Sequence, residues 1–407
     1  MLIFNSKAVV ERRGFRPKFS MTNTIENRYA PDFISPPGET LAEILEERNM
    51  SQSELAQRMG RPKKTINEII KGKAEITIDT ALQIELVLGT PASFWIERER
   101  LYREYLARKN ENQRLKGYLG WLKQIPYRQM TELGWLKFDE DKIEQLRESL
   151  NFFAVVSPEQ WEEIWVRNLS IDFRKSQAFD SDQGAITAWL RQGEIEASKI
   201  NCADYNELKF RDALRQIRSL TIKSIEVFQP QMIELCAAAG VALAFVPELP
   251  KTRVHGATRW LGSHRALIQL SDRYKTNDHF WFSFFHEAGH ILLHGKRTLF
   301  LEGQDKDIRD KIKEKEADVF AANFLIDPGD WQRFIANNSL NRKAINQFAE
   351  QLGIHPGIIV GRMQHEQITS YQNYNDLKEK YCLNTQDSFL VLTSDSPKGK
   401  LPISPLR

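Results

Sequence analysis

The chain has 407 residues. A single hydrophobic core usually organises fewer residues than this, so we expect two or three domains. Hydrophobic residues make up 41% of the sequence and charged residues 27%, a composition that excludes a disordered protein. The formal net charge is only +3. Any attraction to nucleic acid must therefore come from local clusters of basic residues and not from the total charge.

Cysteine usage and hydropathy indicate the cellular compartment. Cys202, Cys236 and Cys382 lie far apart and form no CxxC pair, which argues against a disulfide framework or a thiolate metal site and favours a reducing cytoplasm. No apolar run approaches the roughly 20 residues that span a bilayer, and the N-terminus does not resemble a secretory signal. We expect a cytoplasmic protein without a membrane partner. Residues 1–33, which contain a second plausible start at Met21, are predicted to be a flexible tail.

The segment 34–110 is predicted to form five short helices. Its apolar residues recur at helical spacing in blocks separated by turn-forming residues, namely Asn49, Gly60, Gly72 and Gly89. Ser51 and Glu54 form a capping-box pattern at the start of one helix. The next helix begins at Arg61 and Pro62, where proline is tolerated because its missing N–H would have no helical partner. Two helices joined at a glycine turn are the layout of a helix-turn-helix.

The helix that follows Pro62 has a basic outer face. Its isoleucines lie on one side by the 3.6-residue period, and the opposite side is rich in lysine. The residues predicted to contact DNA are Gln52, Lys63, Lys64, Asn67, Lys71 and Lys73. In this arrangement Lys63, Lys64 and Asn67 meet base edges in the major groove, whereas the last two lysines lie nearer phosphates. A solvated basic face is the alternative interpretation.

Residues 37–106 resemble the Xre family of lambda-repressor-like helix-turn-helix proteins, and within it the HigA-type antitoxins. The most specific matches are Met50-Ser51-Gln52, Leu55-Ala56, Gly60, Gly72-Lys73 and Phe94-Trp95. The resemblance implies a homodimer that represses transcription by binding an inverted-repeat operator in double-stranded DNA. Members of the antitoxin branch also neutralise a toxin, so a toxin is a further expected partner.

The region 111–238 is predicted to be a helical connector with tryptophans in its core and without a catalytic signature. After Gly240 the period changes. Val241–Val246 and Arg265–Ser271 are short apolar runs typical of buried strands, and Gly256–Leu261 is a candidate third strand. We therefore expect a mainly α fold with a small β-sheet, of the α+β class.

An HExxH motif occupies residues 286–290, inside a predicted apolar helix over 280–293. At a spacing of four, His286 and His290 leave the same face of the helix about one turn apart and can share one tetrahedral Zn²⁺, with Glu287 directed at the reacting water. The alternative is a pair of core histidines bonded to the backbone. We favour the metal because two buried imidazoles and a carboxylate need partners that a cation supplies directly.

A catalytic zinc site of this kind needs a third protein ligand. A metzincin is excluded because Leu293 and Lys296 occupy the positions of its glycine and histidine. On a second predicted helix, Glu314 and Asp318 share a face with small residues that permit close helix approach, whereas Glu316 is rotated away. We therefore choose Glu314 as the ligand and expect Asp318 to accept the other ring N–H of a ligating histidine. Glu316 remains the alternative ligand.

The segments GATRWL, ALIQLS, FHEAGHILLHG and EKEADVFAANFLI resemble the ImmA/IrrE family of metallopeptidases. The family pattern of HExxH followed by Glu-x-x-x-Asp matches Glu314 and Asp318. The resemblance implies a zincin-like domain, which we place at 239–380, followed by a flexible tail at 381–407. It also implies zinc, or manganese, as the cofactor and limited proteolysis of a repressor under stress.

These residues predict a zinc-dependent endopeptidase. The cation would acidify a water and polarise the scissile carbonyl, and Glu287 would take the proton and later deliver it to the departing amine. The donor to the oxyanion stays open among four residues, which are His294, Tyr274, His279 and Arg259.

The whole chain is predicted to be a DNA-binding regulator fused to a peptidase that cleaves a repressor or an antitoxin-type protein. One alternative is a HigA-type antitoxin or repressor whose metal domain is sensory or structural and performs no turnover. Another is self-cleavage that separates the two parts. Residues 344–359 repeat a helix-turn-helix rhythm, but we favour helices that complete the peptidase core because outward basic residues are few there.

Overall fold

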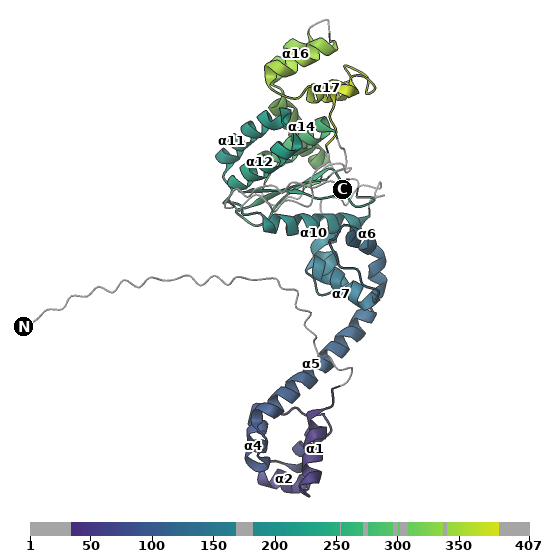
Figure 1. The fold of residues 1–407 in the computed structure, drawn as a ribbon, viewed down its shortest axis with the longest axis vertical. Coiled ribbons are helices and arrows are strands. Elements are labelled where there is room, and N and C mark those ends of the chain that lie inside the picture. Colours follow the sequence, from purple (N-terminus) through teal and green to yellow (C-terminus); the bar gives the residue numbers. More distant parts are fainter. Residues whose placement is uncertain are drawn as a thin grey trace, which may run out of the picture. The chain divides into compact units, whose positions relative to one another are not determined.

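The computed structural model describes residues 34–167, 182–252, 254–271, 276–295, 300–301, 308–336 and 340–381. The predicted tail 1–33, residues 382–407 of the second predicted tail, and Tyr274 lie outside these ranges. The chain divides into two compact units, Met1–Glu111 and Asn112–Arg407. Over the described residues the fold is mainly helical with a small sheet, which confirms the predicted class (Figure 1).

The described part of the first unit contains five helices, as predicted, but the fifth has 25 residues and is not short. They are α1 (Pro37–Glu47), α2 (Gln52–Arg58), α3 (Lys63–Ile70), α4 (Ile78–Leu88) and α5 (Ala92–Lys116), the last of which runs past the boundary of the unit. Each helix contributes a fully buried side chain to one core, and these are Leu41, Leu55, Ile66, Ile84 and Trp95. The isoleucine side predicted for the helix after Pro62 faces this core, where Ile66 and Ile69 are buried.

Local signals in the sequence set the helix ends of this unit. The Ser51 side chain accepts a hydrogen bond from the N–H of Glu54 at 3.1 Å and so caps α2. Gly60 ends the same helix at a φ of 66°, in the left-handed region that side chains rarely adopt. On α1, a side chain at Gly38 would collide with the carbonyl of Ile69, so this glycine lets α1 pack directly on α3.

The second unit is built around a four-stranded sheet. Its strands are β1 (Val241–Phe245), β2 (Gly256–Trp260), β3 (Ala266–Leu270) and β4 (Phe300–Leu301), in the order β1-β3-β2-β4. β1 pairs in parallel with β3, and β2 pairs antiparallel with β3 and β4. The first three strands match the two predicted apolar runs and the candidate third strand. Alternate residues of β1 belong to two different cores, so both faces are buried, which explains a continuous apolar run.

Helices cover both faces of the sheet (Figure 1). One face carries α10 (Gln183–Lys199) and the shorter elements η1 (Leu119–Gln124), α6 (Tyr127–Glu132), α7 (Lys142–Phe153), α8 (Pro158–Trp161) and η2 (Glu162–Val166). The other face carries α11 (Glu207–Ser219), η3 (Leu220–Ile222), α12 (Ile225–Ala238), α13 (Asn277–Leu293), α14 (Ile308–Leu325), α15 (Pro328–Ile335), α16 (Arg342–Leu352), α17 (Pro356–His365) and η4 (Asn375–Leu377).

The region 111–238 is helical, as expected, but it does more than connect. α10 packs against β1 and β3 on one face, and α12 packs against β1 on the other. These helices thus share their cores with the sheet, and from Asn112 onward they belong to the same compact unit. The structure therefore differs from a separate connector, because the central strands need apolar partners on both sides.

The helices over 344–359 complete the core beside α13, as we favoured. Ile345 and Phe348 of α16 and Ile358 and Ile359 of α17 are buried in the same apolar cluster as α13. The apolar positions that imitate a helix-turn-helix rhythm are used for packing inside this unit.

Candidate metal centre and DNA-binding face

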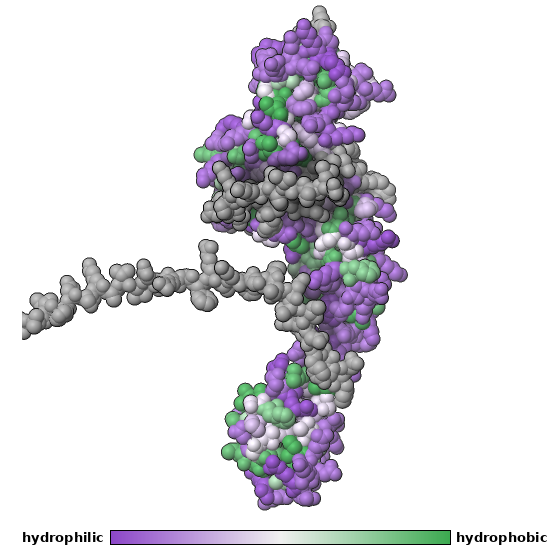
Figure 2. All heavy atoms as spheres, in the orientation of Figure 1, coloured by the Kyte–Doolittle hydropathy of each residue, from purple (hydrophilic) through white to green (hydrophobic). Residues whose placement is uncertain are grey.

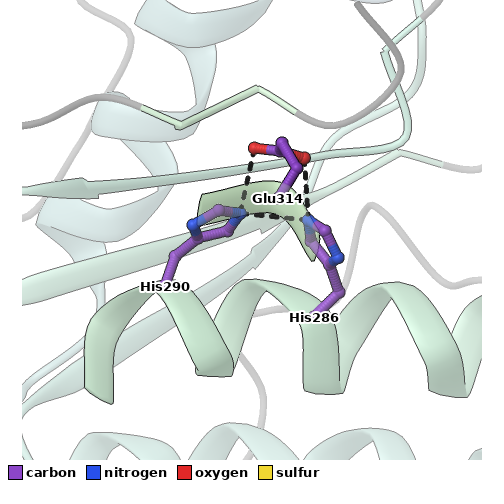
Figure 3. A group of neighbouring side chains, drawn as sticks. All are labelled: His286, His290 and Glu314. Atoms are coloured by element: carbon purple, nitrogen blue, oxygen red, sulfur yellow. Dashed lines mark hydrogen bonds and ion pairs between the residues drawn. The ribbon is translucent and has the colours of Figure 1, made fainter. Parts of the chain in front are cut away.

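Helix α13 presents the HExxH motif from a buried position. Phe280, Phe284 and Ala288, spaced by four, pack into the apolar core of the unit. His286 and His290 leave the helix from another side, one turn apart, and turn toward one another (Figure 3). Their side chains are 2% and 1% exposed, so the two imidazoles are almost fully desolvated.

Glu314 of α14 lies across the two histidines (Figure 3). Its Oε2 is 3.2 Å from Nε2 of His286 and its Oε1 is 3.2 Å from Nε2 of His290, while the two nitrogens are 3.0 Å apart. Ligands held about 2.0–2.1 Å from a tetrahedral Zn²⁺ lie about 3.3 Å from one another. Within the described residues, these three form the one group of His, Cys, Asp and Glu with ligand atoms this close.

The second ring nitrogen of each histidine is also hydrogen-bonded. Nδ1 of His286 lies 2.9 Å from Oδ1 of Asp318, where a ligating imidazole needs an acceptor. Nδ1 of His290 lies 2.9 Å from Nδ1 of His294, and Nε2 of His294 lies 3.0 Å from Oε2 of Glu316. Glu316, the alternative ligand, is therefore directed at His294 and away from the pair of histidines.

The chemistry of the donor set fits a cation. An ionised carboxylate only accepts hydrogen bonds, so the contact with Asp318 places the proton of a neutral His286 on Nδ1 and a lone pair on Nε2. That lone pair faces Nε2 of His290 and the carboxylate of Glu314. Acceptor atoms this close need a shared proton or a cation between them, and a cation would satisfy both nitrogens and the carboxylate at once.

Glu287 is held against strand β2. Its side chain is fully buried, and its Oε2 accepts a hydrogen bond from the hydroxyl of Thr258 at 2.5 Å. A Cβ atom at Gly256 would lie 2.6 Å from Oε1 of Glu287, so only glycine permits this approach. We did not predict either β2 residue to be part of the site. The alternation of a strand would have placed them on one face, but the sequence does not say which face meets α13.

Gly289, inside the motif, sets the distance between the two helices. A Cβ atom there would lie 3.1 Å from Cδ1 of Phe320 and 3.3 Å from Cα of Ala317, both on α14. Ala317 is fully buried. The glycine and this alanine therefore let α14 come close enough for Glu314 to reach both histidines. A glycine inside a helix is the signal that could have revealed this contact.

The residues predicted to contact DNA lie on α2, α3 and the turn after α3. Lys63, Lys64, Lys71 and Lys73 are exposed, whereas Gln52 and Asn67 are half-buried. Nδ2 of Asn67 donates to Oε1 of Gln52 at 3.3 Å, which links α3 to α2. The structure thus leaves the four lysines accessible and holds the amide of Asn67 between two helices.

Two family models match these two regions. Residues 41–95 match the Helix-turn-helix model, and residues 245–355 match the model of the IrrE N-terminal-like domain. The chain joins a helix-turn-helix domain to an IrrE N-terminal-like domain. Both resemblances drawn from the sequence are thereby confirmed at the level of the family. The chain combines a DNA-binding domain with an IrrE/ImmA-like peptidase domain, and the second match contains the histidines and Glu314.

Individual relatives are similar to part of the chain. The HTH-type transcriptional regulator YddM of Escherichia coli K12 is 29% identical over 66 residues, which are 16% of this chain and 70% of the relative. A solved antidote protein of a HigA family from Coxiella burnetii is 32% identical over 21% of this chain and 92% of its own, with a TM-score of 0.20. The antitoxin HigA of Pseudomonas aeruginosa, solved with the higBA promoter, is 26% identical over 21% of this chain and 94% of its own, also with a TM-score of 0.20.

The candidate oxyanion donors of the IrrE N-terminal-like domain have different surroundings. Arg259 lies on β2 next to Thr258 and points to the opposite face of the sheet, where it pairs with Glu194 at 2.9 Å and donates to the carbonyl of Leu190. It is therefore withdrawn as a candidate. His294 contacts His290, and His279 lines a neighbouring cleft, while Tyr274 lies outside the described residues.

That cleft opens beside Asp318, between α13, α14 and α17. It has a volume of about 380 Å³ and a mostly apolar lining that includes Phe282, Val319 and Ile358. Because Asp318 both lines the cleft and contacts His286, the cleft begins one side chain away from the histidine pair.

None of the helices in the described part of the chain combines the length and the apolar character needed to cross a membrane.

Proposed function

We propose that the IrrE N-terminal-like domain is a metal-dependent endopeptidase in which His286, His290 and Glu314 hold a zinc or manganese ion. The observation that carries this proposal is the convergence of two buried imidazole nitrogens, 3.0 Å apart, on the half-buried carboxylate of Glu314, each with one of its oxygens at 3.2 Å. When bound, the ion supplies Lewis acidity, which lowers the pKa of a water and polarises a scissile carbonyl. Asp318 holds the proton on Nδ1 of His286 and thereby keeps Nε2 available to the ion.

Glu287 is assigned the proton transfers. Its carboxylate takes a proton from the attacking water and passes it to the departing amine. The Thr258 hydroxyl fixes the orientation of this carboxylate through Oε2. The cleft beside Asp318, whose mostly apolar wall also carries charged residues such as Lys315 and Arg362, has room for a side chain of a polypeptide, which supports a protein substrate. By the fusion to a DNA-binding domain, we infer that the substrate is a repressor or antitoxin-type protein cleaved under stress.

The decisive comparison is between the wild-type protein and Glu287→Gln. Both are loaded with zinc and co-expressed with repressors encoded nearby, and the cleavage products are identified by mass spectrometry. We expect fragments with the wild type, none with the variant, and equal zinc content. If the wild type cleaves none of them, the alternative of an antitoxin or repressor with a sensory or structural metal domain is favoured. Fragments of the chain itself, from pure zinc-loaded protein, would indicate self-cleavage.

We propose that the helix-turn-helix domain reads an inverted-repeat operator as a homodimer in the cytoplasm. The exposed lysines of α3 supply phosphate and base contacts. On α4, Ile78, Leu82 and Leu86 follow one another at a spacing of four and are 66%, 49% and 86% exposed. Apolar side chains also reach the surface of this domain in Figure 2. Such an apolar row suits a second copy of the chain.

Sedimentation of the full chain tests this dimer. We expect the wild type to sediment as a dimer and Leu86→Lys to sediment as a monomer with an unchanged circular dichroism spectrum. A wild type that sediments as a monomer would contradict the proposed homodimer. A toxin as a further partner is proposed on the resemblance to HigA-type antitoxins, and co-purification with a co-expressed neighbouring toxin tests it.

A further inference from the structure

A third histidine continues the row on α13. His294 follows His290 by four residues, directly after the last residue of the helix, and its side chain is only 4% exposed. Its Nδ1 lies 2.9 Å from Nδ1 of His290, and its Nε2 lies 3.0 Å from Oε2 of Glu316. His294 is therefore hydrogen-bonded at both ring nitrogens, on one side to a candidate ligand and on the other to a carboxylate.

Binding of an ion at His290 would fix the positions of the protons in this chain of contacts. If His290 binds the ion through Nε2, its Nδ1 carries the proton and donates. Nδ1 of His294 must then accept, which leaves the proton of His294 on Nε2, directed at the carboxylate of Glu316. A single tautomer of each ring satisfies both hydrogen bonds and the ligation, so the geometry is consistent from Glu316 to the ion site.

We propose that His294 and Glu316 are positioning residues that hold His290 in its metal-binding tautomer and orientation. We call His290, His294 and Glu316 the His294 relay. The inference rests on the proposed metal site. It states that the two ligating histidines are held by different hydrogen-bond partners. His286 is held directly by Asp318, whereas His290 is held by Glu316 through an interposed imidazole.

The alternative is a role in helix termination alone. The backbone N–H of His294 donates to the carbonyl of His290 at 3.1 Å and so closes the last turn of α13. A residue that acts only in this way affects the stability of the helix end and leaves zinc affinity unchanged. Metal affinity and tautomer state are therefore the readouts that separate the two roles.

The test measures the zinc affinity of the full chain by competition with a chromophoric chelator. His294→Leu removes the acceptor, whereas His294→Asn keeps an acceptor oxygen close to the position of Nδ1. We expect the leucine variant to bind zinc about 10–100-fold more weakly, as for other outer partners of ligating histidines. We expect the asparagine variant to retain most of the affinity. Leu293→Ala, at the neighbouring exposed position, is the matched control and is expected to bind like the wild type.

A second measurement guards against misfolding. Long-range ¹⁵N–¹H spectra of the zinc-loaded wild type are expected to show His290 protonated at Nδ1 and His294 protonated at Nε2. If His294 is protonated at Nδ1, or if a folded His294→Leu protein binds zinc like the wild type, the relay is overturned while the metal site stands. If the wild type itself does not bind zinc, the metal site and the relay both fall.

Discussion

The hydroxyl of Thr258 donates to Oε2 of Glu287 at 2.5 Å, and this bond ties strand β2 to the metal-binding helix α13. The same hydroxyl lies 3.1 Å from the backbone carbonyl of Glu287. Both residues are buried. A strand 29 positions earlier in the chain therefore sets the orientation of the carboxylate that we assign to proton transfer.

Thr258→Val removes this hydroxyl and keeps the shape of the side chain. Because the lost hydrogen bond is made to a buried carboxylate, we expect the free energy of unfolding to fall by about 1–3 kcal/mol, measured by urea denaturation. Thr258→Ser keeps the hydroxyl and should lose less. A valine variant as stable as the wild type would show that the bond contributes nothing to the fold.

Gly256→Ala introduces a Cβ atom that would lie 2.6 Å from Oε1 of Glu287. We expect a loss of about 1–3 kcal/mol in the free energy of unfolding, because a close-packed carboxylate must move. In the background of Glu287→Ala the obstructing group is absent, so the same alanine should cost much less. A double-mutant cycle by urea denaturation measures the difference, and additive effects would contradict the contact.

Zinc is expected to stabilise the protein through the three converging side chains. At a free zinc concentration of 100 times the Kd, binding adds about 2.7 kcal/mol to the free energy of unfolding, and a chelator reverses it. Glu314→Gln should abolish most of this gain in thermal unfolding experiments. The control Glu350→Gln, at an exposed position of α16, should respond to zinc like the wild type.

Substitutions on α3 and in the turn after it should separate affinity from specificity. Lys71→Ala removes an expected phosphate contact and should weaken binding to all sequences about equally. The slope of the logarithm of the binding constant against the logarithm of the salt concentration should become smaller in magnitude by about one. Asn67→Ala should cost about 1–3 kcal/mol on the preferred site and relax its sequence preference. Both are measured by fluorescence anisotropy on a site selected from random duplexes. Lys209→Ala, exposed on α11, serves as the control that should change neither quantity.

His355 is expected to make the fold sensitive to acid. Burial lowers the pKa of His355, and its Nδ1 lies 2.5 Å from Nδ2 of Asn277 and accepts the N–H of Gly357 at 3.1 Å. Protonation is therefore easier in the unfolded chain. The stabilising effect of the neutral His355 side chain is full above the unfolded pKa of about 6.5 and declines as the pH falls below it.

The comparison for this prediction is His355→Asn, which keeps an acceptor for the helix cap but has no titratable group. The free energy of unfolding is compared at pH 7.5 and pH 5, on either side of the unfolded pKa of about 6.5. The wild type should lose more free energy of unfolding between these two pH values than the variant. Equal losses in urea denaturation would assign the acid sensitivity to other groups.

Much of the candidate site could be predicted because its pieces are local. The spacing of His286 and His290 is a property of one helix, and the shared face of Glu314 and Asp318 is a property of another. In the structure Glu314 lies at the histidine pair, as its helix phase predicted. Glu316 contacts His294, which helix phase did not predict. The pairing with His294 depends on how α13 and α14 cross, which a helical period does not contain.

The sequence by itself determined the periods, the turns and the chemistry available: five helices separated by turns at Asn49, Gly60, Gly72 and Gly89, three strands, and two imidazoles one turn apart. These follow from backbone sterics and side-chain spacing within a few residues. Only the tertiary structure decided that Thr258 and Gly256 face Glu287 while Arg259 points to the other side of the sheet, and that the helices after Asn112 cover both faces. Contacts between distant segments depend on how apolar faces pack together, and each face has more than one partner that could bury it.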